Sequence, residues 1–250
     1  MPIMQPVNYD VVAPAYDRRY EGNRYDGVRT VLQRFVEGAH AAAVAEVGCG
    51  TGHWLADLSD GGYSRLFGLD LSPGMLQLAH ASAPNARLVR GAANQLPWAD
   101  HSFDRVFCVN ALHHFPDQQA FISECGRVLR CGGGLLTIGL DPHCGSDQWW
   151  VYEFFPAALH ADRVRYPSTA MMRDWLSAAG FREPVTEVAQ CIAMETPFES
   201  ARQQGSIDRR ATSQLMVISD DEYEAGMTYL LTEQPVLRAN LRLYATTAWM

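Results

Sequence analysis

The chain has 250 residues, 48% of them hydrophobic, and a formal net charge of −8 at pH 7. This composition suits one large folded domain and disfavours a nucleic-acid-binding protein, since neutralising phosphates requires a basic surface. All twenty basic residues are arginine, which excludes chemistry that needs a lysine amine, such as Schiff-base catalysis or a phosphate-loop nucleotide hydrolase.

Helix-like and strand-like segments alternate over the first part of the chain. The expected elements are a helix over 27–37, a strand over 43–47, a helix after the glycine turn 48–52, a strand over 65–69, a helix over 72–81, strands over 87–90 and 103–109, a helix over 117–129 and a fifth strand over 135–140. Such alternation is typical of a doubly wound, mainly parallel sheet with helices on both faces.

The pattern changes after residue 141. Residues 144–161 are dense in aromatic side chains and predict a mostly helical insert after strand five. A helix over 168–179, a strand over 181–191, helical structure over 197–236 and a terminal strand over 241–249 follow. We therefore expect an α/β fold with a seven-stranded sheet in a single domain over 1–250, divided into a core over 27–140 and an acceptor-side insert with sheet completion over 141–250.

Three glycines occupy the turn between the first strand and the following helix, in the segment EVGCGTG at 46–52. Gly48, Gly50 and Gly52 allow the backbone to turn sharply and to approach a ligand closely. The next strand ends at Asp70, whose carboxylate suits the two hydroxyls of a ribose. The combination predicts a nucleoside site, with a purely structural glycine turn as the alternative.

One residue of this segment and the residue directly after it indicate which nucleoside binds. A dinucleotide fingerprint requires glycine at position 53, where this chain has His53, and Glu46 would repel a pyrophosphate. These residues disfavour an NAD-dependent oxidoreductase. The carboxylate of Glu46 suits a cationic amino group instead, such as that of the methionine part of S-adenosylmethionine.

An ordered series of segments resembles the class I S-adenosylmethionine-dependent methyltransferases, in particular the small-molecule group that includes the ubiquinone and menaquinone biosynthesis methyltransferases. The segments are YDxxAxxYD at 9–17, EVGCGTG at 46–52, GLDLSPGML at 68–76, GAANQLPW at 91–98 followed by FD at 103–104, and RVLRCGG at 127–133. The resemblance covers about residues 9–140. It implies a Rossmann-like methyltransferase fold, S-adenosylmethionine as cofactor, and transfer of its methyl group to an oxygen, nitrogen or carbon of a small molecule.

The resemblance also implies a set of cofactor contacts at the strand ends. They are Tyr16, Glu46, Gly48, Cys49, Gly50, Gly52, Asp70, Leu71, Met75, Ala92, Ala93 and Asn110. Asp70 would accept hydrogen bonds from the ribose, while Leu71 and Met75 would pack on the adenine unless they serve only the core. Ala92 departs from the family, in which an acid contacts the adenine amino group. We expect the backbone of Ala93 to serve adenine instead; the departure also leaves open a non-catalytic, cofactor-binding protein.

Candidate acceptor contacts lie in three parts of the chain. Residues 1–26 would fold over the cofactor as a lid and contribute Tyr9 and Tyr20 to the acceptor, with a solvated helix as the alternative. Trp149 and Tyr152 of the aromatic insert would form an acceptor wall, unless they belong to a hydrophobic core. His113 is the expected general base, and a supporting role in its loop is the alternative.

The segment NALHHF, which begins at Asn110, differs from the NPPY-like sequence of enzymes that methylate amino groups of DNA bases or glutamine. We expect Asn110 to offer its backbone carbonyl to the cofactor ammonium. Displacement from a sulfonium mainly requires alignment and exclusion of water, so no dedicated nucleophile is expected, and Cys49 serves as a small residue. The six cysteines form no metal-ligand cluster, which together with the lack of a signal or membrane segment predicts a reduced, metal-free cytoplasmic protein.

Overall fold

The computed structural model describes residues 9–12, 16–17, 20, 25–38 and 42–250. The expected lid over 1–26 therefore lies partly outside the described residues. The described residues form two compact units, one within 9–139, 169–190 and 243–250 and the other of residues 140–168 and 191–242. The segment 141–250 is thus shared between the two units, and the single domain stays a prediction.

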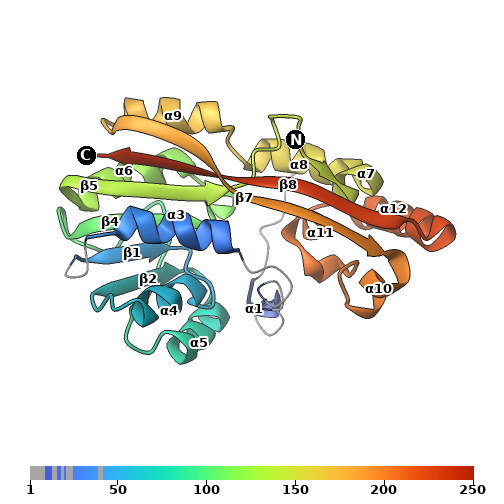
Figure 1. The fold of residues 1–250 in the computed structure, drawn as a ribbon, viewed down its shortest axis with the longest axis horizontal. Coiled ribbons are helices and arrows are strands. Elements are labelled where there is room, and N and C mark those ends of the chain that lie inside the picture. The colour runs from blue at the N-terminus through green and yellow to red at the C-terminus, as the bar shows by residue number, and fades with distance from the viewer. Residues whose placement is uncertain (1–8, 13–15, 18–19, 21–24, 39–41) are drawn as a thin grey trace. The chain divides into compact units, whose positions relative to one another are not determined.

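A parallel sheet forms the centre of the first unit, called the core unit below. Its strands are β1 (Val44–Val47), β2 (Leu66–Asp70), β3 (Arg87–Arg90), β4 (Phe103–Val109) and β5 (Leu129–Gly139), to which the antiparallel β8 (Val236–Trp249) adds through its C-terminal half. The strands lie in the order β3-β2-β1-β4-β5-β8 (Figure 1). The chain adds β2 and β3 on one side of β1 and then adds β4 and β5 on its other side, so the order of strands reverses between β1 and β4. Ligands of doubly wound sheets bind outside the carboxyl ends of strands at such a point.

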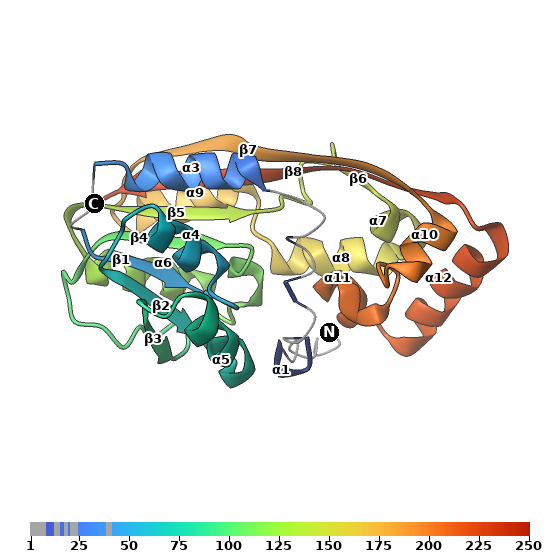
Figure 2. The same cartoon turned by 60° about the horizontal axis from the view of Figure 1, so that its bottom comes forward.

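Helices cover both faces of this sheet. They are α3 (Asp26–Val36), α4 (His53–Asp60), α5 (Pro73–Ser82), α6 (Gln118–Val128) and α9 (Thr169–Ala178), and α5 lies beside β2 and β3 (Figure 2). Adjacent strand residues point to opposite faces. Leu69 belongs to the core cluster that includes α6 and α9, whereas a Cβ on Gly68 would lie 2.7 Å from Leu55 of α4. Thus α6 and α9 cover one face and α4 the other.

Strand β5 begins earlier than the sequence predicts. The glycine run Gly132 to Gly134 was expected to separate a helix from a strand at residue 135, but β5 starts at Leu129, directly after α6. Gly132 adopts a φ of 76° and its N–H bonds to the carbonyl of Met250, so the run forms a bulge that stays paired with the end of β8. Glycine permits this bulge because it tolerates positive φ.

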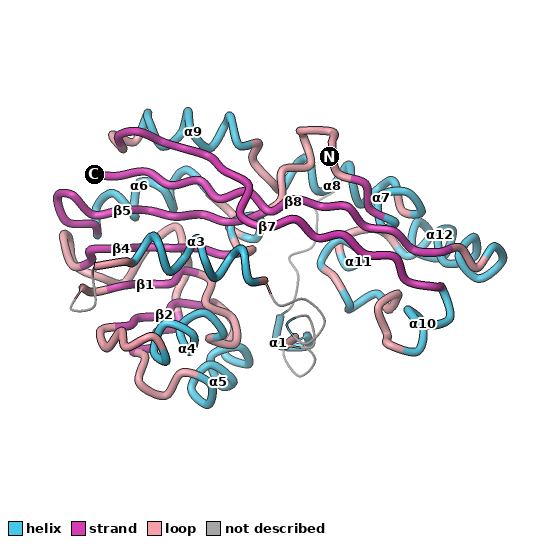
Figure 3. The backbone as a smooth tube through the Cα atoms, viewed as in Figure 1, coloured by secondary structure: helices cyan, strands magenta, loops and turns pink. Residues whose placement is uncertain are grey.

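The last two long strands also exceed the predicted bounds. β7 (Arg182–Pro197) pairs with β8 (Figure 3). Both strands contribute residues to the core unit and to the other unit. A two-residue strand, β6 (Gln148–Trp149), pairs with the N-terminal half of β8. The sheet therefore has eight strands, seven of which the sequence predicts.

The second unit, called the insert unit below, is mostly helical outside its strands, as expected. Its helices are α7 (Trp150–Phe154), α8 (Pro156–Arg165), α10 (Phe198–Gln203), the 3₁₀ helix η3 (Arg209–Ala211), α11 (Ser213–Met216) and α12 (Asp220–Glu233). Trp150, Phe155 and Leu230 are buried in one apolar cluster of this unit. Among the helices that the structure describes, none is both long and apolar enough to cross a membrane.

Candidate functional site

The turn after β1 has the backbone shape that its glycines predict. Gly48, Gly50 and Gly52 have φ values of 76°, 52° and 79°, a region that disfavours other residues. The N–H groups of Gly48 and Cys49 donate to the carbonyl of Leu69 at 2.7 and 3.0 Å, which holds the turn against the end of β2. A Cβ on Gly48 would lie 2.4 Å from the Cβ of Ala111, so this position has no room for a side chain.

Asp70 lies at the end of β2 beside this turn. Its Oδ2 accepts the N–H of Gly50 at 2.8 Å, and its Oδ1 accepts the N–H of Ser72 at 2.9 Å. Burial raises the pKa of Asp70, although the hydrogen bonds from Ser72 and Gly50 oppose that rise. Each carboxylate oxygen can accept further hydrogen bonds, so the position suits a ribose diol.

Glu46 places a buried carboxyl group behind the glycine turn. The residue is 1% exposed, and no described residue bonds to its Oε2. Burial, followed by repulsion from Asp70, raises the pKa of Glu46 well above its ordinary value. A buried acid without a partner is unfavourable by itself, and a ligand cation such as an ammonium would compensate it. Glu46 and Asp70 thus fit the two polar ends of S-adenosylmethionine.

Cys49 lies within the glycine turn and is 5% exposed. Burial, together with repulsion from Glu46 and Asp70, raises the pKa of its thiol well above the ordinary value. A thiol held in its protonated form is a poor nucleophile. The geometry agrees with Cys49 as a small packing residue.

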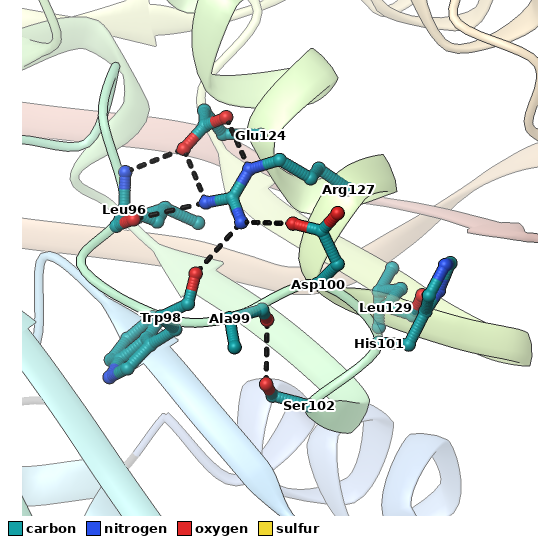
Figure 4. A network of polar contacts seen from close by, with 9 residues as sticks. All are labelled: Leu96, Trp98, Ala99, Asp100, His101, Ser102, Glu124, Arg127 and Leu129. Atoms are coloured by element: carbon teal, nitrogen blue, oxygen red, sulfur yellow. Dashed lines mark hydrogen bonds and ion pairs between the residues drawn. The ribbon is translucent and has the colours of Figure 1, made fainter.

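The loop after β3 carries Ala92 and Ala93 and is held by a network around Arg127 (Figure 4). Arg127 binds the carboxylate of Glu124 through Nε and a terminal nitrogen, both at 2.7 Å. Its terminal nitrogens also donate to the carbonyls of Leu96 at 3.0 Å and Trp98 at 2.8 Å. These bonds fix the backbone at Leu96 and Trp98, a few residues after Ala93, whose backbone is the predicted adenine contact.

The two predicted apolar contacts differ in exposure. Leu71 is 65% exposed directly after Asp70, so its side chain is available to a ligand at this edge. Met75 is 1% exposed, which matches the core-packing alternative in the absence of a ligand. Ala92 is half-buried and Ala93 is buried. Their contacts with adenine stay predictions.

The end of β4 brings the two histidines to the same edge of the sheet. Asn110 has a φ of 50°, which is uncommon for a residue other than glycine and turns the chain into η2 (Leu112–His114). His113 is 8% exposed, whereas His114 is half-buried and its Nε2 shares a hydrogen bond of 2.5 Å with the hydroxyl of Tyr9. The Tyr9 hydroxyl and Nε2 of His114 therefore have the geometry of a proton-transfer pair.

Described residues of the N-terminal segment lie against the glycine turn and α4. A Cβ on Gly50 would lie 3.8 Å from Cε1 of Tyr16. Tyr20 stacks on His53, with ring centroids 3.7 Å apart and planes inclined by 4°. Burial lowers the pKa of His53. The structure thus brings Tyr9, Tyr16 and Tyr20 to the edge that carries Asp70 and Glu46, all within the core unit.

The remaining two predicted residues belong to the insert unit. Tyr152 is half-buried, and its hydroxyl donates to Oδ2 of the buried Asp162 at 2.6 Å. The ring of Trp149 meets that of Tyr152 edge to face at 5.1 Å. Their role toward the acceptor stays a prediction.

Sequence reasoning missed two residues that the structure brings to the site, Asp10 and Asp17, and it ranked a third, His114, below His113. Asp10 accepts hydrogen bonds from Ser72, Asp17 accepts one from Thr51, and His114 binds Tyr9. The partners are 62, 34 and 105 residues apart along the chain. The repeated YD pair of the segment at 9–17 was a signal, but only its tyrosines were interpreted.

The strand order, the glycine turn and the carboxylate at the end of β2 define a Rossmann-like, nucleoside-binding α/β protein. Residues 45–137 match the methyltransferase domain family. A demethylmenaquinone methyltransferase of Staphylococcus aureus is 40% identical over 163 residues, which make up 63% of this chain and 68% of the relative.

Solved structures share the fold. The YcgJ protein of Bacillus subtilis has a TM-score of 0.64 and 22% identity, with 90% of this chain and 98% of that chain covered. Phosphoethanolamine N-methyltransferase 2 of Haemonchus contortus, solved with S-adenosyl-L-methionine, has a TM-score of 0.64 and 17% identity, with 99% of this chain and 60% of that chain covered.

This chain belongs to the class I S-adenosylmethionine-dependent methyltransferases. It is an enzyme that transfers a methyl group from S-adenosylmethionine to a small-molecule acceptor, as the sequence predicts. The alternatives of an NAD-dependent oxidoreductase and of a non-catalytic binding protein are not favoured.

Proposed function

We propose that the acceptor is a ring-bearing hydroxyl compound of the quinol type, and that Tyr9 and His114 accept the hydroxyl proton during methyl transfer. The observation that carries this proposal is the 2.5 Å hydrogen bond between the Tyr9 hydroxyl and Nε2 of His114 at the cofactor edge. The Staphylococcus aureus relative, named for a demethylated quinone, supports the acceptor class.

The chemistry requires the acceptor to become more nucleophilic as the methyl group arrives. When the proton of neutral His114 is on Nδ1, Nε2 accepts the proton of Tyr9, and the Tyr9 oxygen in turn accepts the acceptor proton. The resulting phenolate of the acceptor carries its charge on oxygen and on the ring carbons ortho and para to it, so methylation of the oxygen or of such a carbon uses the same activation. Methylation of a carbon is completed when that carbon releases its proton and the ring becomes aromatic again. The bound cofactor supplies the electrophilic methyl group and leaves as the neutral thioether.

Aromatic side chains beside this pair support a flat acceptor. The rings of Tyr9 and Tyr16 meet edge to face at 6.0 Å, as do those of Tyr9 and His114 at 4.9 Å. Trp149 and Tyr152 remain proposed acceptor contacts through their rings, since the Tyr152 hydroxyl already binds Asp162.

The assay supplies isotope-labelled S-adenosylmethionine with a panel of quinols, catechols, aliphatic amines and RNA, and analyses products by mass spectrometry. We expect a quinol or phenol product one methyl group heavier, whose fragmentation assigns the methyl to oxygen or carbon. Methylation of the amines alone would reject the acceptor class. Label in RNA would reject the further proposal that nucleic acid is not a substrate, which rests on the net charge of −8.

Variants test the proton-transfer pair separately. We expect His114→Gln to lower kcat about 100-fold without changing cofactor affinity, and Tyr9→Phe to have a similar effect. His113→Gln tests the base predicted from sequence, and His80→Gln, on the exposed side of α5, is the matched control. Loss of kcat in His113→Gln with normal kcat in His114→Gln would return the role to His113.

We also propose that the enzyme works in the reducing cytoplasm. Its cysteines, all within the described part of the chain, form no disulfide, and three of them are exposed. Oxidising environments normally pair such thiols. Fractionation of cells that express the tagged protein tests this compartment.

A further inference from the structure

Two aspartates of the N-terminal segment bond to residues that flank the Asp70 carboxylate. Oδ1 of Asp10 accepts the hydroxyl of Ser72 at 2.5 Å and the N–H of Gly74 at 3.0 Å. Oδ1 of Asp17 accepts the hydroxyl of Thr51 at 2.6 Å. The segment is thus anchored at two points, one at the start of α5 and one at the glycine turn.

The two residues that bind these aspartates, Ser72 and Thr51, lie at or directly after the backbone N–H groups that orient the Asp70 carboxylate. Ser72, which binds Asp10 through its hydroxyl, also donates its N–H to Oδ1 of Asp70 at 2.9 Å. Thr51, which binds Asp17, follows Gly50, whose N–H donates to Oδ2 of Asp70 at 2.8 Å. The carboxylate that suits the ribose is therefore linked on both sides to the N-terminal segment.

A purely structural role of Asp10 as a helix cap does not explain this arrangement. Helix α5 already has its cap, because the hydroxyl of Ser72 accepts the N–H of Met75 and Pro73 occupies the first helical position. Between the two aspartates, Tyr16 places its ring over the glycine turn, near Gly50. The segment therefore follows the cofactor edge rather than the end of one helix.

We propose that Asp10 and Asp17 are positioning residues that couple S-adenosylmethionine binding at Asp70 to docking of the N-terminal segment. Fixing Ser72 and Thr51 holds the backbone donors that orient the Asp70 carboxylate, so its oxygens face the ribose before the cofactor arrives. Such coupling is reciprocal: the bound cofactor holds the segment as strongly as the segment holds the cofactor.

The reciprocal effects give two readouts that do not depend on turnover. Calorimetry measures S-adenosylmethionine affinity, and trypsin measures docking, because the chain contains no lysine and Arg18 and Arg19 lie next to Asp17. In the wild type we expect saturating cofactor to slow cleavage at these arginines. Asp10→Ala and Asp17→Ala should each weaken binding about fivefold or more and abolish the protection.

Two further variants separate positioning from loss of stability. Asp10→Asn keeps a carbonyl oxygen that accepts from Ser72 and Gly74, so we expect binding within about twofold of wild type. Asp117→Ala removes the aspartate that caps α6 by accepting the N–H of Ala120 at 2.9 Å, and should leave affinity and cleavage unchanged.

Several results would overturn the proposal. The first is a wild type that trypsin cleaves at the same rate with and without the cofactor, and the second is alanine variants that bind the cofactor like wild type. The others are an Asp117→Ala variant that binds as weakly as Asp10→Ala, and an Asp10→Asn variant that binds no better than Asp10→Ala. Thermal unfolding of each variant establishes that it is folded, and the Asp17→Ala variant provides an independent test if Asp10→Ala does not fold.

Discussion

Replacing Asp70 by alanine should weaken S-adenosylmethionine binding by more than tenfold. Hydrogen bonds to a charged acceptor contribute about 1.5–3 kcal/mol each, and the ribose offers two donors. Part of this gain is lost because burial raises the pKa of Asp70, and part because the carboxylate already binds the N–H groups of Gly50 and Ser72. A net loss of about 1.4 kcal/mol or more, which is a factor of ten, therefore remains.

The assay is calorimetric titration of wild type, Asp70→Ala and Asp104→Ala with S-adenosylmethionine. Asp104 is a matched control, because its Oδ2 accepts the N–H of Ala43 at 2.8 Å and pairs with Arg130 at 2.7 Å near the opposite end of the strands. We expect Asp104→Ala to lower thermal stability while affinity stays within about twofold. A folded Asp70→Ala variant with wild-type affinity would falsify the assignment of the ribose to this carboxylate.

Further predictions concern stability. The pKa of Glu46 is raised well above 4.5 by burial and then by Asp70, so the proton it binds on folding stabilises the protein below pH 4.5, and this stabilisation is lost as pH rises through the folded pKa. Glu46→Gln should remove this pH dependence in urea unfolding and bind the cofactor more weakly, whereas an unchanged pH profile would contradict the buried acid. Gly226→Ala places a Cβ 2.3 Å from the ring of Phe155 and should cost about 1–3 kcal/mol in urea unfolding; a cost below about 0.5 kcal/mol would show that the contact relaxes. Arg127→Ala removes bonds from a side chain that is 32% exposed, so we expect the free energy of unfolding to fall by only about 1–2 kcal/mol and the cofactor to bind more weakly. Normal cofactor affinity in this variant would show that the Arg127 network does not support the cofactor site.

The shape of the glycine turn and the position of Asp70 at a strand end were predictable because their signals are local. Gly48 to Gly52 must adopt positive φ at alternate positions, and Asp70 is fixed by the end of the next strand. Each constraint is visible within one strand, turn and helix. The strand bounds were less accurate where long-range pairing decides them, as at Gly132, whose bond to Met250 extends β5 into a predicted turn.

Other parts of the site depend on contacts that no local pattern encodes. Asp10 and Asp17 belong to a segment that was interpreted through its tyrosines alone. Their hydrogen-bond partners lie on two different turns of the core unit. Tyr152 was predicted to contact a ligand, but its hydroxyl donates a hydrogen bond to Asp162 within the insert unit. Residue type alone could not distinguish a side chain bonded within the protein from one available to a ligand.

The choice between the two adjacent histidines shows where this limit lies. Sequence reasoning favours His113 over His114, although the two stand next to each other after the end of β4. In the 3₁₀ helix η2 their ring centroids lie 3.8 Å apart, His113 is 8% exposed, and Nε2 of His114 shares a hydrogen bond with Tyr9, 105 residues away along the chain. A proton-transfer role needs a partner within hydrogen-bond distance, and the tertiary structure provides one for His114 in Tyr9, which residue order alone does not show.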